Sequence, residues 1–169
     1  QTVAIGAYGN DDNGSSSGHV RVYGYDGSAW NQRGADIDGE ATDDYSGYSV
    51  SLSSDGQTVA IGAYGNDDNG SSSGHVRVYG YDGSTWEQLG DDIDGEAASD
   101  NSGRSVSLSS DGQTVAIGAI GNDANGSFSG HVRVYGYDGS AWEQLGDDID
   151  GEAARDYSGR SVSLSSDGQ

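Results

Sequence analysis

The sequence contains no cysteine, no proline and no methionine, and all seven of its basic residues are arginine. Without cysteine, the chain has neither a disulfide framework nor thiolate ligands for a metal or redox centre. It also has no apolar run near the roughly 20 residues that a membrane-spanning helix needs. We therefore expect no membrane span, and we expect a fold held together by apolar packing and backbone hydrogen bonds.

Positive charge is scarce, since 28 acidic residues against 7 basic residues give a net charge of −21. Binding to phosphates requires a basic surface, so this charge excludes nucleic acid as a natural partner and disfavours an anionic membrane surface. An acidic surface keeps an extended protein in solution and attracts cations. Two interpretations remain open: a solvated acidic coat, and specific sites for divalent cations.

One 56-residue sequence, which begins QTVAIGA, occurs three times in succession. The copies span residues 1–56, 57–112 and 113–168, and Gln169 begins a fourth copy. Repeats 1 and 2 differ at 8 positions, and repeats 2 and 3 differ at 6. Near-identical copies supply the same groups three times, whereas a catalytic centre brings together different groups. The repetition therefore indicates a structural array and not an enzyme.

Each repeat contains four segments with the period-two alternation of β-strands. In repeat 1 they cover residues 2–7, 19–25, 29–33 and 49–53. Asp-Gly pairs favour tight type I′ hairpins and alternate with long polar loops, and no segment has an apolar stripe of helical period. The sequence predicts an all-β fold in which each repeat is a four-stranded antiparallel meander.

A single meander of this composition buries too little apolar surface to stand alone, so the sheets are expected to stack face to face. Stacked four-stranded meanders are the blades of a β-propeller, with the serine-rich SVSLS strand innermost. Three blades are fewer than the usual four to eight. We expect either a six-bladed ring of two chains or an open spiral of blades that continues through further copies. A β-solenoid is the alternative fold.

The segment YSGYSVSLSSDGQTVAIGA (residues 45–63), followed by a polar loop and GHVRVY, resembles the FG-GAP repeat of integrin α-subunit propellers. It resembles still more closely the FG-GAP-like repeats of large bacterial and algal surface proteins. The resemblance covers all three repeats and implies an extracellular β-propeller used in adhesion or assembly. The calcium loop of that family is shortened to residues 53–56 here, and its Phe-Gly and Gly-Ala-Pro are Ser46-Gly47 and Gly6-Ala7-Tyr8. The calcium ligands of the family are therefore not carried over.

Three N-glycosylation sequons occupy the same position in the first polar loop of each repeat, at Asn13, Asn69 and Asn125. Such sequons mark glycan acceptors in secreted eukaryotic proteins. The alternative is that each Asn-Gly pair simply forms a turn. We predict an N-linked glycan here if the chain is secreted by a eukaryotic cell.

The acidic motif DIDGE recurs in every repeat and offers several carboxylates that could bind Ca²⁺. The candidate ligands are Asp36, Asp38, Glu40, Asp92, Asp94, Glu96, Asp148, Asp150 and Glu152. The segment Asn10-Asp11-Asp12 is a second candidate, although the position of Asp12 holds Ala124 in repeat 3. The alternative for both segments is a solvated turn.

One histidine and one tryptophan of each repeat allow two interpretations. The histidines, which are His19, His75 and His131, could form a zinc ring, but the repeat supplies no soft ligands beside them. The sequence therefore favours a histidine that caps the start of an edge strand. The tryptophans, which are Trp30, Trp86 and Trp142, either pack between blades or stack on sugars.

The predicted function is that of a structural or adhesive extracellular or cell-surface repeat protein. Its partners would be further copies of itself, assembled head to tail into a ring or a fibre. The alternative function is a ligand-binding propeller, either a lectin that binds carbohydrate or a calcium-dependent adhesin.

Overall fold

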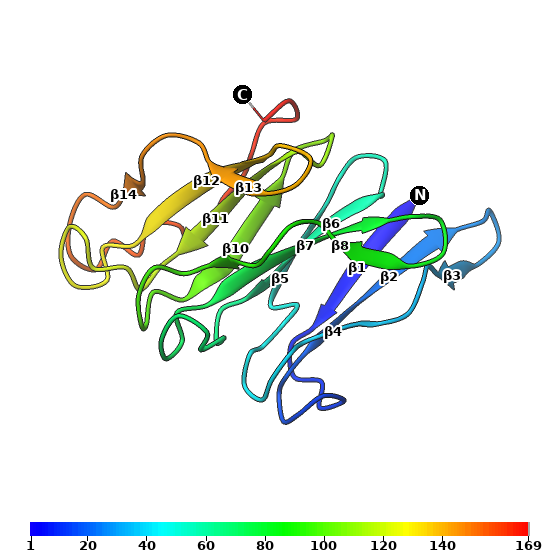
Figure 1. The fold of residues 1–169 in the computed structure, drawn as a ribbon, viewed down its shortest axis with the longest axis horizontal. Helices are drawn as coiled ribbons and strands as arrows, with labels where there is room; N and C mark the ends of the chain where they lie inside the picture. Colours follow the sequence, from blue (N-terminus) through cyan, green and yellow to red (C-terminus); the bar gives the residue numbers. More distant parts are fainter. Residues whose placement is uncertain (169) are drawn as a thin grey trace.

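The computed structural model describes residues 1–168 and contains three antiparallel β-sheets that lie side by side along the long axis of the molecule (Figure 1). The first sheet consists of β1 (Thr2–Ala7), β2 (His19–Tyr25), β3 (Trp30–Gln32) and β4 (Ile37–Asp38). The second consists of β5 (Ser49–Leu52), β6 (Thr58–Ala63), β7 (His75–Tyr81), β8 (Trp86–Gln88) and β9 (Ile93–Asp94). The third consists of β10 (Ser102–Leu108), β11 (Thr114–Ala119), β12 (His131–Tyr137), β13 (Trp142–Gln144) and β14 (Ile149–Asp150). No helix occurs within residues 1–168, and the all-β prediction is confirmed.

The first strand of each complete sheet comes from the repeat before it. The SVSLS segment of repeat 1 forms β5, which pairs with β6 of repeat 2, and β10 pairs with β11 in the same way. In repeat 3 the corresponding segment, residues 161–165, forms no strand. Its TVAIGA partner would lie in a fourth repeat, of which Gln169 is the first residue.

The outermost strand of each sheet is divided into two short pieces. In the second sheet, β8 pairs with the end of β7, with Trp86 opposite Tyr81. The two-residue β9 pairs with the start of the same strand, with Ile93 opposite Val76. The sequence pattern predicts a long polar loop around Ile37, Ile93 and Ile149. This prediction is wrong, because each isoleucine begins a short strand. Ile93 is only 5% exposed, and its burial draws the backbone on either side of it into the sheet.

The Asp-Gly hairpins use a different turn from the predicted type I′. In the turn at residues 53–56, the N–H of Gly56 donates to the carbonyl of Ser53 at 3.0 Å. Gly56 takes a φ of 69°, but Asp55 does not adopt a positive φ. A type I turn followed by a left-handed glycine has this pattern. Asp55 instead accepts hydrogen bonds from the hydroxyl of Ser53 and the N–H of Gln57.

The apolar core lies between neighbouring sheets, and we call each of these two contacts a seam. The first seam, between the first and second sheets, buries Val20, Val22, Ile37, Val59, Ile61 and Tyr79. The second seam, between the second and third sheets, buries Ala60, Val76, Val78, Ile93, Leu108, Val115, Ile117 and Tyr135. Alternate residues of β6 and β7 thus point into opposite seams, as the period-two pattern predicts.

Glycine and serine allow the second and third sheets to approach closely at β5, β6 and β10, which we call the inner strands. A Cβ on Gly62 of β6 would lie 2.1 Å from the carbonyl oxygen of Gly103 in β10. The hydroxyl of Ser49 donates to that same carbonyl at 2.8 Å, and the N–H of Leu108 donates to the hydroxyl of Ser51 at 3.0 Å. Small residues therefore let hydrogen bonds join one inner strand to the next across the seam.

The tryptophans pack between sheets wherever a preceding sheet exists. The indole N–H of Trp86 donates to the carbonyl of Arg33 at 2.7 Å, and that of Trp142 donates to the carbonyl of Leu89 at 2.7 Å. Each ring also packs against the core of its seam. Trp30, which has no preceding sheet, is 49% exposed. The packing interpretation is thus confirmed for two of the three rings.

We expect Gly62→Ala to lower the free energy of unfolding by about 1–3 kcal/mol, because the added methyl group would overlap the backbone of Gly103 and force the seam apart. Gly9→Ala is the matched control, since a Cβ there meets no atom within 4 Å. Urea unfolding followed by circular dichroism measures both variants. Equal stability of the two would contradict the proposed close approach.

Candidate functional site

A buried histidine begins the middle strand of each sheet. β7 lies between β6 on one side and β8 with β9 on the other, so His75 occupies an interior strand and not the edge strand expected from the sequence. His75 and His131 are each 1% exposed, and His19 is 4% exposed. The Nδ1 atom of all three histidines is buried without a hydrogen-bond partner.

Carboxylates from two repeats surround His75 in the first seam. Its Nδ1 lies 3.4 Å from an oxygen of Asp92 and 3.9 Å from an oxygen of Asp68, both in repeat 2. Glu40 of repeat 1 reaches across the seam and places an oxygen 3.9 Å from the same nitrogen. All four ligand atoms lie within 4.8 Å of one another, so they could hold one metal ion.

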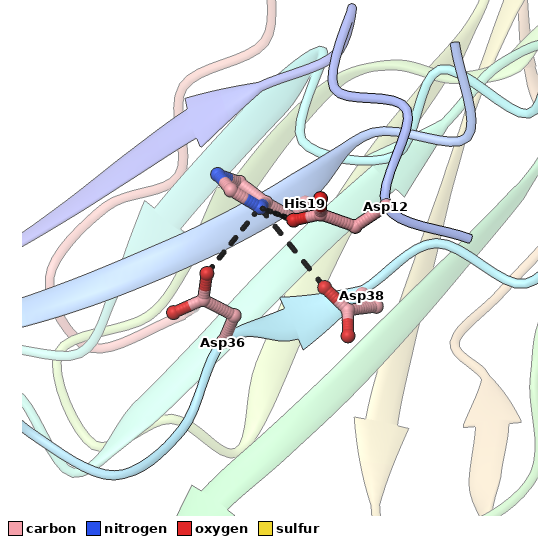
Figure 2. A group of neighbouring side chains, drawn as sticks. All are labelled: Asp12, His19, Asp36 and Asp38. Carbon is pink, nitrogen blue, oxygen red and sulfur yellow. Dashed lines mark ion pairs between the residues drawn. The ribbon is translucent and has the colours of Figure 1, made fainter. Parts of the chain in front are cut away.

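The other two histidines face groups of different composition, and the group at His19 also has three carboxylates. Figure 2 shows Asp12, Asp36 and Asp38 directed at Nδ1 of His19, at 3.8, 3.5 and 4.0 Å. Within residues 1–168, no glutamate takes the place beside His19 that Glu40 takes beside His75. His131 in the second seam faces Asp148 at 3.5 Å and Glu96 at 3.9 Å. Ala124 stands where repeats 1 and 2 have an aspartate, so one carboxylate is missing there.

The DIDGE motif does not fold as one local calcium loop. The first aspartate of each motif lies beside the histidine of its own repeat; these aspartates are Asp36, Asp92 and Asp148. The second aspartate of each motif pairs with the same histidine across the sheet; these aspartates are Asp38, Asp94 and Asp150. Its glutamate points to the histidine of the next repeat, as Glu40 and Glu96 do. Glu152 occupies the corresponding position after the last seam and is exposed.

Burial and like charge govern the electrostatics of the first seam. Burial lowers the pKa of His75 to about 4, and the neighbouring charge of Arg77 acts in the same direction, so the imidazole is neutral at pH 7. Burial raises the pKa of Glu40, against the opposing effect of Arg77, whose guanidinium lies 3.4 Å from the second carboxylate oxygen of Glu40. Burial likewise raises the pKa of Asp94, and the nearby Asp92 adds to this shift.

The sequon asparagines have a structural role in their loops. The side-chain N–H₂ of Asn69 donates to the carbonyls of Gly95 and Glu96, at 2.7 and 3.2 Å. Asn13 makes the same pair of bonds to Gly39 and Glu40. This amide nitrogen is the atom that a glycan would modify. The asparagines therefore hold the first polar loop against the DIDGE segment, and their glycosylation stays a prediction.

The three stacked sheets with recurring seams define a tandem-repeat protein built of β-blades. FG-GAP repeats match residues 36–79 and 93–135, which together cover half of the sequence. The chain therefore belongs to the FG-GAP repeat family, as the resemblance indicated. FG-GAP repeats are non-enzymatic modules that occur in extracellular proteins of the adhesion type.

A comparison with curated protein sequences gave no significant match. Within residues 1–168, no helix has the length and apolar character required to span a membrane.

We expect Asn69→Ala to lower the free energy of unfolding by about 1 kcal/mol, because the carbonyls of Gly95 and Glu96 would lose their donor. Ser71→Ala is the control, since it removes the same sequon and leaves the asparagine in place. Both variants are produced in a glycosylating host and compared by thermal unfolding and intact mass. An equal loss of stability in the two variants would attribute the stabilisation to a glycan and contradict the structural role.

Proposed function

We propose that the chain is a structural or adhesive repeat protein of the extracellular space or cell surface, and that its sheets continue by head-to-tail association with further copies. The observation that carries this proposal is that the two ends of the molecule present the two complementary halves of a seam. Membership of the FG-GAP family supports the extracellular, adhesive setting.

The first sheet presents one half of a seam, which we call the head face. It consists of Val3, Ile5, Tyr23 and Trp30. Ile5 is 51% exposed, although its counterparts Ile61 and Ile117 are each 1% exposed within seams. The side chains of this face are thus placed for burial against a sheet that the single chain does not contain.

The third sheet presents the other half, which we call the tail face. It consists of Val132, Val134 and Ile149. Ile149 is 58% exposed, whereas the corresponding Ile37 and Ile93 are each 5% exposed. In both seams the side chains of the tail type lie against those of the head type. The tail face of one chain is therefore complementary to the head face of another.

The backbone supports the same arrangement. β1 pairs only with β2, so its other edge has free N–H and C=O groups. Residues 161–164 repeat the sequence of β5 but form no strand. Addition of this segment to β1 of a second chain would complete a four-stranded sheet by strand pairing. Such a head-to-tail contact gives a ring if the rotation closes, as in a six-bladed ring of two chains, and a filament if it does not.

The half-exposed ring of Trp30 supports a second candidate function, carbohydrate binding. This ring lies beside that of Tyr25, with the two centroids 5.2 Å apart. Trp86 and Trp142 are partly buried in the seams, which leaves Trp30 as the most open sugar platform among the three tryptophans. A glycan array with and without EDTA tests both the lectin and the calcium-dependent adhesin, and an absence of binding in both conditions eliminates them.

Mixing two blocked variants tests head-to-tail assembly. Ile5→Glu places a charge on the head face and Ile149→Glu places one on the tail face, so each variant keeps one functional end. We expect each variant alone to be monomeric in sedimentation velocity at physiological salt. An equimolar mixture should form dimers that grow no further, because each dimer has used the only two intact faces.

Asn31→Glu is the control for added charge, since repeats 2 and 3 carry glutamate at this exposed position. That variant should associate as the unmodified chain does. An unmodified chain that stays a 17 kDa monomer at high concentration, or variants that associate as it does, would overturn the proposed assembly.

A further inference from the structure

We propose that the seams between neighbouring sheets bind a divalent cation of the zinc class, which joins one repeat to the next. The four-residue group whose ligands come from two repeats lies in the first seam. Its ligands are Nδ1 of His75 and carboxylate oxygens of Asp68 and Asp92 from repeat 2, together with Glu40 from repeat 1.

The buried histidine is the observation that distinguishes this group from an ordinary acidic surface. The side chain of His75 is 1% exposed, and its Nδ1 has no hydrogen-bond partner although three carboxylates face it. Polar atoms so deeply buried are nearly always satisfied. A neutral imidazole offers the lone pair of Nδ1 to a metal ion.

The spacing of the four atoms fits a tetrahedral ion. Zinc binds nitrogen and oxygen ligands at about 2.0–2.2 Å, which places tetrahedral ligand atoms about 3.3–3.6 Å apart. The carboxylate oxygens lie 3.4, 3.9 and 3.9 Å from Nδ1 of His75. Shortening the two longer separations by about half an ångström would match this spacing. The side chains of Asp68 and Glu40 are both exposed.

The charges of the cluster also suit a divalent cation. Asp68, Asp92 and Glu40 contribute three negative charges, and Arg77 beside Glu40 contributes one positive charge. The balance is two negative charges, which a single divalent cation neutralises. Glu40 can serve both partners, because one of its oxygens faces Arg77 and the other faces His75.

The presence of an imidazole favours zinc over calcium. Calcium takes six to eight oxygen ligands, whereas this site offers one nitrogen and three carboxylates. Mixed imidazole and carboxylate sites suit zinc and its neighbours in the first transition row. The site therefore differs in chemistry from the candidate calcium site within a single DIDGE segment.

The repeats themselves supply a matched comparison. Ala124 in the second seam stands where Asp68 stands in the first, so the second seam lacks one carboxylate near His131. Asp68→Ala makes the first seam resemble the second, and Ala124→Asp does the reverse. Asp91→Ala is the control, because it removes an exposed carboxylate outside the cluster and repeat 1 carries Ala35 there. Each change places a residue where another repeat of this chain already tolerates it.

Zinc titration of the full chain tests the proposal. The measurement uses the Ile5→Glu chain, so that association between chains does not contribute to the signal. Excess Mg²⁺ is present throughout, so that non-specific binding of Zn²⁺ to the acidic surface is suppressed. Isothermal titration calorimetry gives affinities, and ¹⁵N NMR of the imidazole rings reports on metal binding at Nδ1. We expect Zn²⁺ to shift the Nδ1 signal of His75. Asp68→Ala should weaken its binding at least about tenfold, Ala124→Asp should strengthen binding at His131, and Asp91→Ala should change neither.

Three results would overturn the proposal. One is Zn²⁺ binding that leaves the ring signals of His75 unshifted. Another is an equal loss of affinity with Asp68→Ala and Asp91→Ala, which would indicate adventitious binding to a charged surface. The third is Ca²⁺ binding as tightly as Zn²⁺.

The site at His19 extends the proposal to the contact between chains, and this step rests on the proposed head-to-tail assembly. Glu152 of a second copy corresponds to Glu40 and would lie beside His19 in the shared seam. Glu152→Gln should reduce the strengthening of association by Zn²⁺ and leave both metal-free association and zinc binding at His75 unchanged. If the chain does not associate at all, the assembly fails while the site at His75 stands. If Zn²⁺ strengthens association equally in Glu152→Gln, this extension alone is contradicted.

Discussion

The structure depends on one constraint: the apolar face of each sheet is covered only by the neighbouring sheet. Val76 and Val78 of β7 are completely buried because the third sheet lies over them, while Val132 and Val134 of the third sheet remain partly exposed. A sheet with both faces apolar cannot be stable in isolation, and identical sheets solve this problem when each presents the complement of its own other face. Near-identity of the repeats follows from this requirement, as does the exposure of one seam half at each end.

The seams differ in character from their inner to their outer parts. Glycine and serine of the inner strands bring backbones together and form hydrogen bonds across the seam, as Ser49 does with Gly103. Valine and isoleucine fill the middle. Histidine, arginine and carboxylates then gather where the polar loops begin. Arg77 is buried in the first seam and donates to the carbonyl of Asp38, while the equivalent Arg21 of the first sheet is exposed. Within residues 1–168, the polar cluster of the first sheet is thus more exposed than that of the second sheet, as is its apolar face.

Sequence patterns predicted the larger part of the fold. Alternation in TVAIGA and HVRVYGY located the long strands, and the serine-rich SVSLS segment was correctly predicted as the first strand at one edge of the sheet. The short strand at Ile37–Asp38 was missed because two residues show no period, and its pairing depends on burial of the isoleucine. The turn type was wrong because Asp-Gly is compatible with two hairpin geometries, and the bonds that Asp55 accepts select between them.

The candidate site was harder to predict because its members are far apart in the sequence. Glu40 and His75 come from different repeats, and only stacking of the sheets brings them together. The carboxylates were identified as candidate metal ligands from their spacing, but they were assigned to one local loop. The prediction that the histidines lie on edge strands was wrong, because the strand that each begins is paired on both sides. Repeat 3 has Ala124 where repeats 1 and 2 have an aspartate, although the DIDGE motif is the same in all three repeats. This difference marked the position as distinct from the motif.

The central claim is that stability resides in the seams and not in the individual sheets. The most direct measurement is the free energy of unfolding of chains with one, two, three and four repeats, obtained by urea denaturation at a concentration where each is monomeric. The account predicts that a single repeat is unfolded and that each further repeat adds a constant increment, as expected for nearest-neighbour coupling. A single repeat that folds by itself, with no gain in stability from its neighbours, would contradict it.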